Sequence, residues 1–130
     1  PKYQTEGSVG MDLSAFIEND ILIKPNEREL IPTGIAVSLP QNIEGQVRPR
    51  SGLSLKYGIT VLNSPGTIDS DYRGEIKVIL INHGNEDFII KNNDRIAQLV
   101  FNEVVKVSFK EVKDLDQTSR NQKGFGSTGK

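Results

Sequence analysis

The apolar residues of this 130-residue chain occur in short runs that proline, glycine and asparagine residues separate. The runs are rich in β-branched residues and have the length of strands. Such runs, regularly interrupted by turn residues, indicate an antiparallel sandwich or barrel. We therefore predict an all-β fold. The expected strands lie in residues 21–23, 30–31, 35–39, 59–62, 76–81, 88–90, 96–101 and 104–112.

One segment departs from the strand pattern. Residues 51–58 begin with Ser51, a residue type that favours the N-cap of a helix, and end with Gly58, which favours its C-terminal end. We predict a helix of about two turns here. Its first turn would present free backbone N–H groups to an anion.

The composition limits the core and excludes several classes of site. The chain is 35% hydrophobic and has no Trp, so Ile, Val and Leu must form the core, and we expect oligomerisation to complete the burial. Without cysteine there is no disulfide, thiol catalysis or Cys-ligated zinc. The only histidine, His83, rules out a multi-histidine metal site, and we place it in a surface turn.

The polarity of the chain changes near its end. From Asp114 onward the residues are polar or glycine, apart from one Leu and one Phe, and cannot bury a core. We predict a domain of residues 1–113 and a flexible tail of residues 114–130. A net charge of −1 and the lack of a long apolar run favour a cytoplasmic protein that binds neither nucleic acid nor membrane. Because the chain begins with Pro1, we expect its natural start to precede this residue.

The arginines indicate phosphate binding. Five of the six lie in or beside the breaks between expected strands, and the planar guanidinium suits two-point contact with phosphate. Arg50 is the best candidate, because it directly precedes the expected helix start at Ser51. The alternative is that these arginines are solvated loop charges.

A second polar segment, residues 66–74, contains Asp69, Asp71, Tyr72 and Arg73. A carboxylate in such a break could orient and deprotonate a water molecule. The two aspartates have the same parity, so strand alternation does not choose between them. Taken alone, this segment is more simply interpreted as a polar hairpin connection.

Residues 124–129 read Gly-Phe-Gly-Ser-Thr-Gly. Glycines let a backbone fold closely around phosphates, hydroxyls add hydrogen bonds, and Phe125 could stack on a base. No Gly-Lys-Ser/Thr sequence follows, so this is not a Walker A motif. Taken alone, the segment is more simply interpreted as a C-terminal extension without fixed structure.

Taken together, these segments resemble the five motifs of the dUTPase family in order and spacing. The matching segments are residues 10–15, 45–53, 66–74, 94–99 and 120–129. The family usually has glycines where this chain has Asn121 and Lys123, and its first strand normally precedes the start of this chain. The resemblance implies a distorted jelly-roll or β-barrel subunit with one short helix. It also implies a threefold homotrimer in which each active site draws on all three chains.

The resemblance further implies Mg²⁺-dependent hydrolysis of dUTP to dUMP and pyrophosphate, by attack of water at the α-phosphorus. This reaction keeps uracil out of DNA and supplies dUMP for thymidylate synthesis. The triphosphate itself would hold most of the Mg²⁺ coordination, with Asp12 as an outer-shell contact through water. Two alternatives stay open: a dCTP deaminase-like enzyme of the same fold, which needs a glutamate at the pyrimidine, and a catalytically inactive nucleotide-binding trimer.

Roles for individual residues also come from the resemblance. Asp69 would activate the water, Tyr72 would lie against the deoxyribose, and Phe125 would stack on uracil when the tail closes. Residues 61–68 would read uracil, and Lys77 would contribute through its backbone. The other substrate-binding residues implied are Asn63, Thr67 and Ile68 at the base, and Arg50, Ser51, Gly52, Gln98, Arg120, Gly126, Ser127 and Thr128 at the phosphates.

Overall fold

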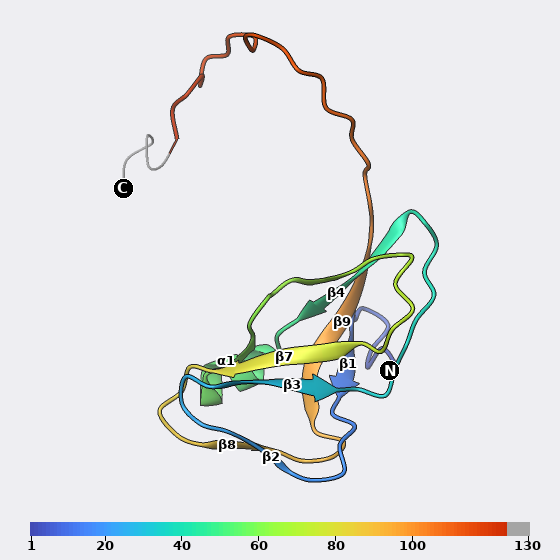
Figure 1. Cartoon of the computed structure of the whole chain (residues 1–130), viewed down its shortest axis with the longest axis vertical. Coiled ribbons are helices and arrows are strands. Elements are labelled where there is room, and N and C mark those ends of the chain that lie inside the picture. The colour runs from blue at the N-terminus through green and yellow to red at the C-terminus, as the bar shows by residue number, and fades with distance from the viewer. Residues whose placement is uncertain (125–130) are drawn as a thin grey trace.

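The computed structural model describes residues 1–124, which form antiparallel strands and one short helix (Figure 1). One sheet has the order β1-β9-β4-β6, another the order β3-β7-β5, and β2 pairs with β8. The prediction of a β fold with one helix is confirmed. The elements are β1 (Gly10–Ser14), β2 (Ile21–Ile23), β3 (Arg28–Pro32), β4 (Ile43–Arg48), α1 (Ser51–Tyr57), β5 (Ile59–Val61), β6 (Gly66–Ile68), β7 (Lys77–Asn82), β8 (Phe88–Ile90) and β9 (Arg95–Glu103).

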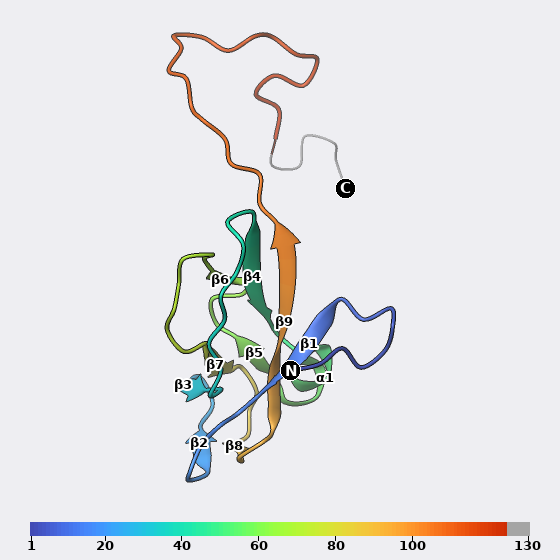
Figure 2. The same ribbon diagram turned by 90° about the vertical axis from the view of Figure 1, so that its right-hand side faces the viewer.

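The core lies between the sheets and consists of Ile, Val and Leu, as the composition predicts. In Figure 1, β3 and β7 cross in front of β9 and β1, and the side view of Figure 2 separates these two layers. Strand alternation turns every second side chain inward, so that Val78, Leu80 and Asn82 of β7 are buried. The buried Ile, Val and Leu residues are Leu13, Ile23, Ile31, Val47, Ile59, Val61, Ile68, Ile76, Val78, Leu80, Ile90, Ile96, Leu99 and Val100.

Asn82 is a polar side chain inside this core, and its amide is fully used. Its Nδ2 donates to the carbonyls of Ile23 at 2.9 Å and Glu86 at 2.8 Å. Its Oδ1 accepts the N–H of Gly84 at 2.8 Å. These bonds join β2, the end of β7 and the turn that follows, so burial of the amide is compensated. His83 lies exposed in the same turn, as predicted.

The predicted helix is present, but its N-cap is not the predicted residue. Arg50 is the last extended residue and occupies the N-cap, with no side-chain capping hydrogen bond. The prediction of Ser51 as N-cap is therefore wrong, because Ser51 already has helical geometry. Gly58 ends the helix with φ of 70°, as predicted. A Cβ atom at Gly58 would overlap the backbone of Gly84, so the helix end is seated directly on the turn after β7.

Two expected strands are wrong. Residues 35–39 form no strand, although Ile35, Val37 and Leu39 pack on the core at alternate positions. Ile76, next to β7, donates its N–H to Ile35 O at 2.7 Å, and both edges of β7 are already paired with β3 and β5. The alternation at residues 35–39 therefore reflects burial of every second side chain on the core and not strand pairing.

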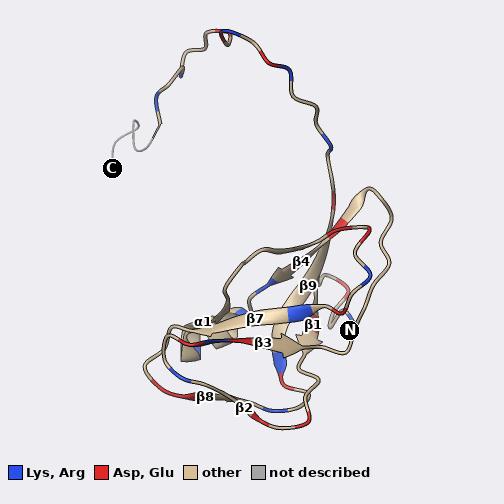
Figure 3. Cartoon of the chain, viewed as in Figure 1, with Lys and Arg blue, Asp and Glu red and all other residues tan. Residues whose placement is uncertain are grey.

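Residues 104–112 form no strand either, because β9 ends at Glu103. After a last hydrogen bond from Val104 N to Asn42 O at 2.9 Å, the chain leaves the domain, as Figures 1 and 2 show, and no strand of residues 1–124 pairs with it. The side chains that would have formed one face of this strand are 85% exposed at Val105, 71% at Val107 and 97% at Phe109. Basic and acidic residues are interspersed along this segment (Figure 3). The predicted boundary after residue 113 stays a prediction.

Three strands lie outside the expected apolar runs. β1, β4 and β6 contain glycines and polar residues, so they lack the apolar pattern of a strand. At Gly45 of β4, a Cβ atom would lie 3.2 Å from Cβ of Ile68, so glycine allows β4 and β6 to approach closely. These strands carry parts of the segments that resemble family motifs.

Candidate active site

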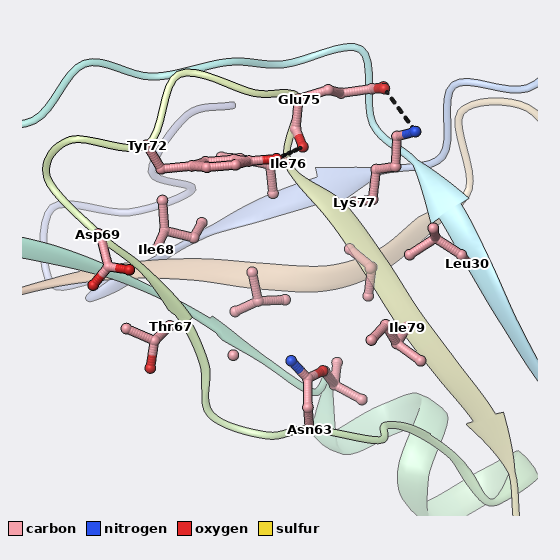
Figure 4. Close-up of a pocket in the computed structure, with 14 residues that line it drawn as sticks. Leu30, Asn63, Thr67, Ile68, Asp69, Tyr72, Glu75, Ile76, Lys77 and Ile79 are labelled. Atoms are coloured by element: carbon pink, nitrogen blue, oxygen red, sulfur yellow. Dashed lines mark hydrogen bonds and ion pairs between the residues drawn. The ribbon is translucent and has the colours of Figure 1, made fainter.

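A cavity of about 330 Å³ opens beside β5, β6 and β7 (Figure 4). Five of the sequence-predicted base and sugar residues line it together with Asp69, and they come from two short stretches of chain. Its walls are otherwise mostly aliphatic. The lining residues are Leu30, Val47, Val61, Asn63, Gly66, Thr67, Ile68, Asp69, Tyr72, Glu75, Ile76, Lys77, Val78 and Ile79.

The segment that joins β5 to β6 contributes Asn63 and Gly66 to the lining of the cavity. Because β5 pairs with β7 and β6 pairs with β4, this segment connects two sheets and is not a hairpin. Leu62 N donates to Ile79 O at 2.9 Å, which anchors the segment to β7, and Ser64 N donates to Val61 O at 3.2 Å. Gly66 lies close to the Asn63 amide, since a Cβ atom there would be 3.2 Å from Asn63 Nδ2. These contacts hold Asn63 beside the cavity.

The loop after β6 carries Asp69 and Tyr72 and is closed by its own hydrogen bonds. Tyr72 N donates to Asp69 O at 3.1 Å, and Tyr72 Oη donates to Glu75 O at 3.0 Å. Arg73 Nη1 donates at 2.8 Å to the carbonyls of Ser70 and Tyr72. Arg73 thus stabilises the loop through two of its carbonyls and does not line the cavity.

Gly74 is required by the position of the Tyr72 ring. A Cβ atom at Gly74 would overlap Oη and Cζ of Tyr72 and lie 2.9 Å from Cε2. The ring therefore lies flat against residue 74, and Figure 4 shows it along one wall of the cavity. The glycine in this segment is a packing requirement that the sequence did not reveal.

The structure distinguishes the two aspartates that the sequence left open. Asp69 lines the cavity, whereas Asp71 does not. Asp69 also lines a neighbouring depression, together with Ser70, Asp71 and Arg73, so its carboxylate lies where two surface hollows meet. A water molecule held by Asp69 would have access to a ligand in either hollow.

Glu75 lines the cavity but was not a sequence-predicted site residue. Its Oε1 accepts the N–H of Gly34 at 2.8 Å, and its Oε2 lies 3.7 Å from Nζ of Lys77 (Figure 4). The carboxylate therefore ties the loop before residue 35 to the start of β7. No motif marked Glu75, because its role depends on a contact 41 residues away in the sequence. The cavity is also lined by three aliphatic residues that no motif marked, namely Leu30, Ile76 and Ile79.

A second group of predicted residues surrounds the start of α1. Asp12 Oδ1 lies 3.3 Å from Arg50 Nε, and Asp12 Oδ2 lies 3.2 Å from Nη1 of Arg95. Arg50 Nη1 also donates to the backbone carbonyl of Arg95 at 2.6 Å. Gln98 Nε2 donates to Pro49 O at 3.0 Å, one residue before Arg50. Ser51 and Gly52 follow as the first exposed residues of the helix.

Neighbouring strands bring this second group together. Asp12 on β1 lies opposite Gln98 on β9, and Gln98 in turn lies opposite Arg48 on β4. A Cβ atom at Gly10 would overlap Oε1 of Gln98, so glycine leaves room for that amide. Residues far apart in the sequence thus meet across one sheet.

The two groups do not share a cavity within one chain. Asp12, Arg50, Ser51, Gly52 and Gln98 are absent from the lining of the first cavity. Arg50 and Arg95 instead line a separate depression. Arg120 lies in the segment after β9, where its Nε donates to Lys123 O at 2.9 Å. The predicted residues Phe125, Gly126, Ser127 and Thr128 lie outside the described residues.

Two further searches concern metals and membranes. Within residues 1–124 no group of three or more His, Cys, Asp or Glu side chains is arranged to hold a metal ion. Over the same residues, no helix has the length and apolar character that crossing a membrane requires.

The fold and these two groups define an antiparallel β domain with a cavity of about 330 Å³ and, apart from it, a pair of arginines held by one aspartate. The sequence model of the dUTPase family matches residues 1–129, and the chain belongs to this family. The family prediction from the motifs is therefore confirmed.

Related proteins agree with this assignment. The deoxyuridine 5'-triphosphate nucleotidohydrolase of Fusobacterium nucleatum is 56% identical over 130 residues, which cover 100% of this chain and 89% of that protein. The protein of the same name from Rickettsia canadensis is 60% identical over 129 residues, which cover 99% and 87%. A solved dUTPase of Staphylococcus bacteriophage 80alpha, with dUPNHPP, has a TM-score of 0.89 and 25% identity and covers 99% and 90%.

Proposed function

We propose that this protein hydrolyses dUTP to dUMP and pyrophosphate. The observation that carries the proposal is the cavity in which Asn63, Thr67, Asp69 and Tyr72 lie together, in a chain that belongs to the dUTPase family. The bacterial relatives are named for this activity, and the bacteriophage 80alpha dUTPase was solved with the dUTP analogue dUPNHPP. Such an enzyme would act on the cytoplasmic deoxynucleotide pool.

The cavity supports recognition of a pyrimidine. The segment of residues 61–68, which connects β5 to β6, has backbone donors and acceptors and the Asn63 amide, which would match the edge of uracil and leave cytosine unmatched. Its aliphatic walls, including Ile68 and the backbone beside Lys77, would enclose the ring. Tyr72 lies along one wall, where its ring would pack on the deoxyribose and leave no room for a 2′-hydroxyl.

Asp69 is proposed as the general base. It accepts a proton from water, the water oxygen forms a bond to the α-phosphorus, and the bond from this phosphorus to the bridging oxygen breaks. The electron pair leaves with pyrophosphate. Charge in the transition state is spread over phosphate oxygens, so most of the catalysis comes from positioning and electrostatics. The exposed position of Asp69, where two hollows meet, supports this role.

The phosphates are proposed to bind the second group. Arg50 has a guanidinium suited to two-point phosphate contact, and Ser51 and Gly52 begin the helix beside it. Gln98 is adjacent. The tail would complete the site: Arg120, Gly126, Ser127 and Thr128 would reach the terminal phosphates, and Phe125 would stack on uracil and exclude water.

This arrangement requires more than one chain, and we propose a threefold homotrimer with a jelly-roll subunit. The base cavity of one subunit would face the Arg50 group of a neighbour, which explains why one chain holds both groups but not one site. The exposed apolar side chains at Val105, Val107 and Phe109 support this assembly, since they need a partner surface. The tail, proposed as residues 114–130, would then close the site of another subunit.

Mg²⁺ is proposed as the cofactor. The solved dUTPase of the S. aureus phage phi11, at 22% identity, coordinates a structural Mg(II) ion, and its TM-score of 0.80 here shows the fold alone. The triphosphate would supply most of the Mg²⁺ ligands, in keeping with how this ion is usually bound. The ion would neutralise phosphate charge, while Asp69 and the arginines perform the steps described above.

One observation makes the deaminase alternative worth testing: a glutamate, Glu75, does line the cavity. Its two carboxylate oxygens, however, are occupied by Gly34 N–H and by Lys77, which leaves it poorly placed to act on a bound base. We therefore favour dUTP hydrolysis.

The test is to incubate the protein with dUTP, dCTP, dTTP and UTP, with and without Mg²⁺, and to measure pyrophosphate and ammonia. We expect Mg²⁺-dependent pyrophosphate release from dUTP only. Ammonia from dCTP without pyrophosphate from dUTP would establish the deaminase, and nucleotide binding without either product would establish the inactive trimer. Sedimentation equilibrium should give three times the mass of the 14.4 kDa chain.

A further inference from the structure

We propose that Asp12 is a positioning residue that fixes the guanidinium of Arg50 for the phosphates, independently of any metal ion. The inference rests on the proposed dUTP hydrolysis, because it concerns how that site binds its substrate. Asp12 contacts both arginines of the second group: its Oδ1 lies 3.3 Å from Arg50 Nε and its Oδ2 3.2 Å from Arg95 Nη1.

Arg50 is held at two points on its guanidinium. Asp12 contacts Nε, and the carbonyl of Arg95 accepts a hydrogen bond from Nη1 at 2.6 Å. An ion pair at Nε and a hydrogen bond at Nη1 thus restrain two different nitrogens, and with them the plane of the guanidinium. The Arg50 side chain is still 29% exposed, so it is fixed in place and remains accessible to a ligand.

The backbone before Arg50 is fixed by the same strand pair. Gln98, which lies opposite Asp12 in the register of β1 and β9, donates from Nε2 to Pro49 O at 3.0 Å. Asp12 therefore restrains the side chain of Arg50, and Gln98 restrains the backbone at Pro49, the residue before it. Both restraints come from one sheet, and the carbonyl of Arg50 also accepts the N–H groups of Leu53 and Ser54 at 3.1 Å, which ties the residue to α1.

The charges around Asp12 favour this role over metal contact. Two guanidinium groups flank the Asp12 carboxylate and compensate its charge, which lowers its attraction for a cation, while Asp94 lines the same depression as Arg50 and Arg95. Each carboxylate oxygen already faces a guanidinium nitrogen. Asp12 also offsets the repulsion between Arg50 and Arg95, which lets both side chains lie side by side. The prediction of Asp12 as an outer-shell magnesium contact becomes the competing hypothesis.

Substrate-analogue binding without metal separates the two roles. We would measure the Kd of the non-hydrolysable analogue dUPNHPP by calorimetry, in EDTA and in Mg²⁺, for the full-length chain and for Asp12→Asn. The positioning role predicts about tenfold weaker binding in both conditions, the order expected for losing one charge-assisted hydrogen bond. Weaker binding in Mg²⁺ alone would overturn the proposal. Asp20→Asn, which changes a carboxylate exposed in a loop, is the matched control and should bind normally.

A double-mutant cycle tests whether Asp12 acts through Arg50. In an Arg50→Ala background, Asp12→Asn should weaken binding by less than about twofold, because the group it positions is gone. If Asp12→Asn raised the Kd by the same factor with Arg50 and with Ala at this position, the proposal would be overturned. If Asp12→Asn fails to fold by circular dichroism, Asp12→Ser replaces it.

A wild-type protein that releases no pyrophosphate from dUTP would refute the proposed function. An active wild type with unchanged Asp12→Asn affinity would refute this inference alone.

Discussion

The substitution Gly74→Ala tests whether the Tyr72 ring is held in place by the absence of a side chain at residue 74. The new Cβ would lie 2.5 Å from Tyr72 Cζ and closer still to Oη, whereas ordinary contact begins at 3.4 Å. The ring must therefore move by about 0.9 Å or more, and its hydrogen bond to Glu75 O, now 3.0 Å, would break.

The substitution should lower the free energy of unfolding only slightly but should lower kcat/KM strongly. Tyr72 is 46% exposed, so the ring can turn into solvent, and the loss of one such hydrogen bond is worth about 1 kcal/mol. Misplacement of a positioning group by about 1 Å, by contrast, can cost a factor of about 100 in rate. We expect kcat/KM for dUTP to fall between about tenfold and about 100-fold. We also expect the preference for dUTP over UTP to weaken, because the wall against the 2′-hydroxyl has moved.

Pyrophosphate release from dUTP and UTP, together with a thermal melt, would measure both effects. Gly7→Ala is the control, since a Cβ atom there meets nothing within 4 Å, and it should leave kcat/KM and the dUTP preference unchanged. If Gly74→Ala kept wild-type kcat/KM and the full preference against UTP, the proposed packing of Tyr72 on the sugar would be wrong. A large loss of stability would show instead that the ring supports the fold.

Three further outcomes are expected. Asp69→Asn should keep nucleotide affinity in calorimetry but lower kcat by about 100-fold or more, and near-normal kcat would remove Asp69 as the base. A chain truncated after Thr118 should remain a folded trimer by sedimentation with little pyrophosphate release, and full activity would show that the tail has no catalytic role. Asn82→Ala leaves the buried carbonyl of Ile23 and the part-buried carbonyl of Glu86 and N–H of Gly84 without their partner, so urea unfolding at fixed protein concentration should show a loss of about 2–4 kcal/mol, and a loss below about 1 kcal/mol would contradict the burial argument.

The strands that the sequence predicted correctly are those whose own side chains form the core. The expected residues 76–81 correspond to β7, where alternate residues are buried between two partners, so apolar pattern and structure coincide. β4 and β6 were not predicted, because their close packing depends on the absence of a side chain at Gly45, and an apolar pattern does not show this. Residues 35–39 bury alternate side chains as a strand does, but they join none of the sheets of residues 1–124, and local sequence does not show whether a partner strand is available.

The sequence predicted the candidate site where one short segment supplies several of its side chains. Asp69 and Tyr72 lie within four residues, so a motif could mark them, and the structure places both at one cavity. Glu75 and Gly74 were missed because their roles are contacts with Gly34 and with the Tyr72 ring, which only the folded chain reveals. The contact of Asp12 with Arg50 likewise joins residues on different elements of the fold.

The wrong strand at residues 104–112 and the division of the site into two groups have one physical explanation. A segment with Val105, Val107 and Phe109 on one face has strand character, yet within residues 1–124 nothing covers that face. Likewise Arg50 has a fixed guanidinium but no base cavity beside it. Both features are incomplete in one chain and become complete if a second copy supplies the missing surface. In the proposed trimer, a neighbouring subunit would supply the surface that both features lack in one chain.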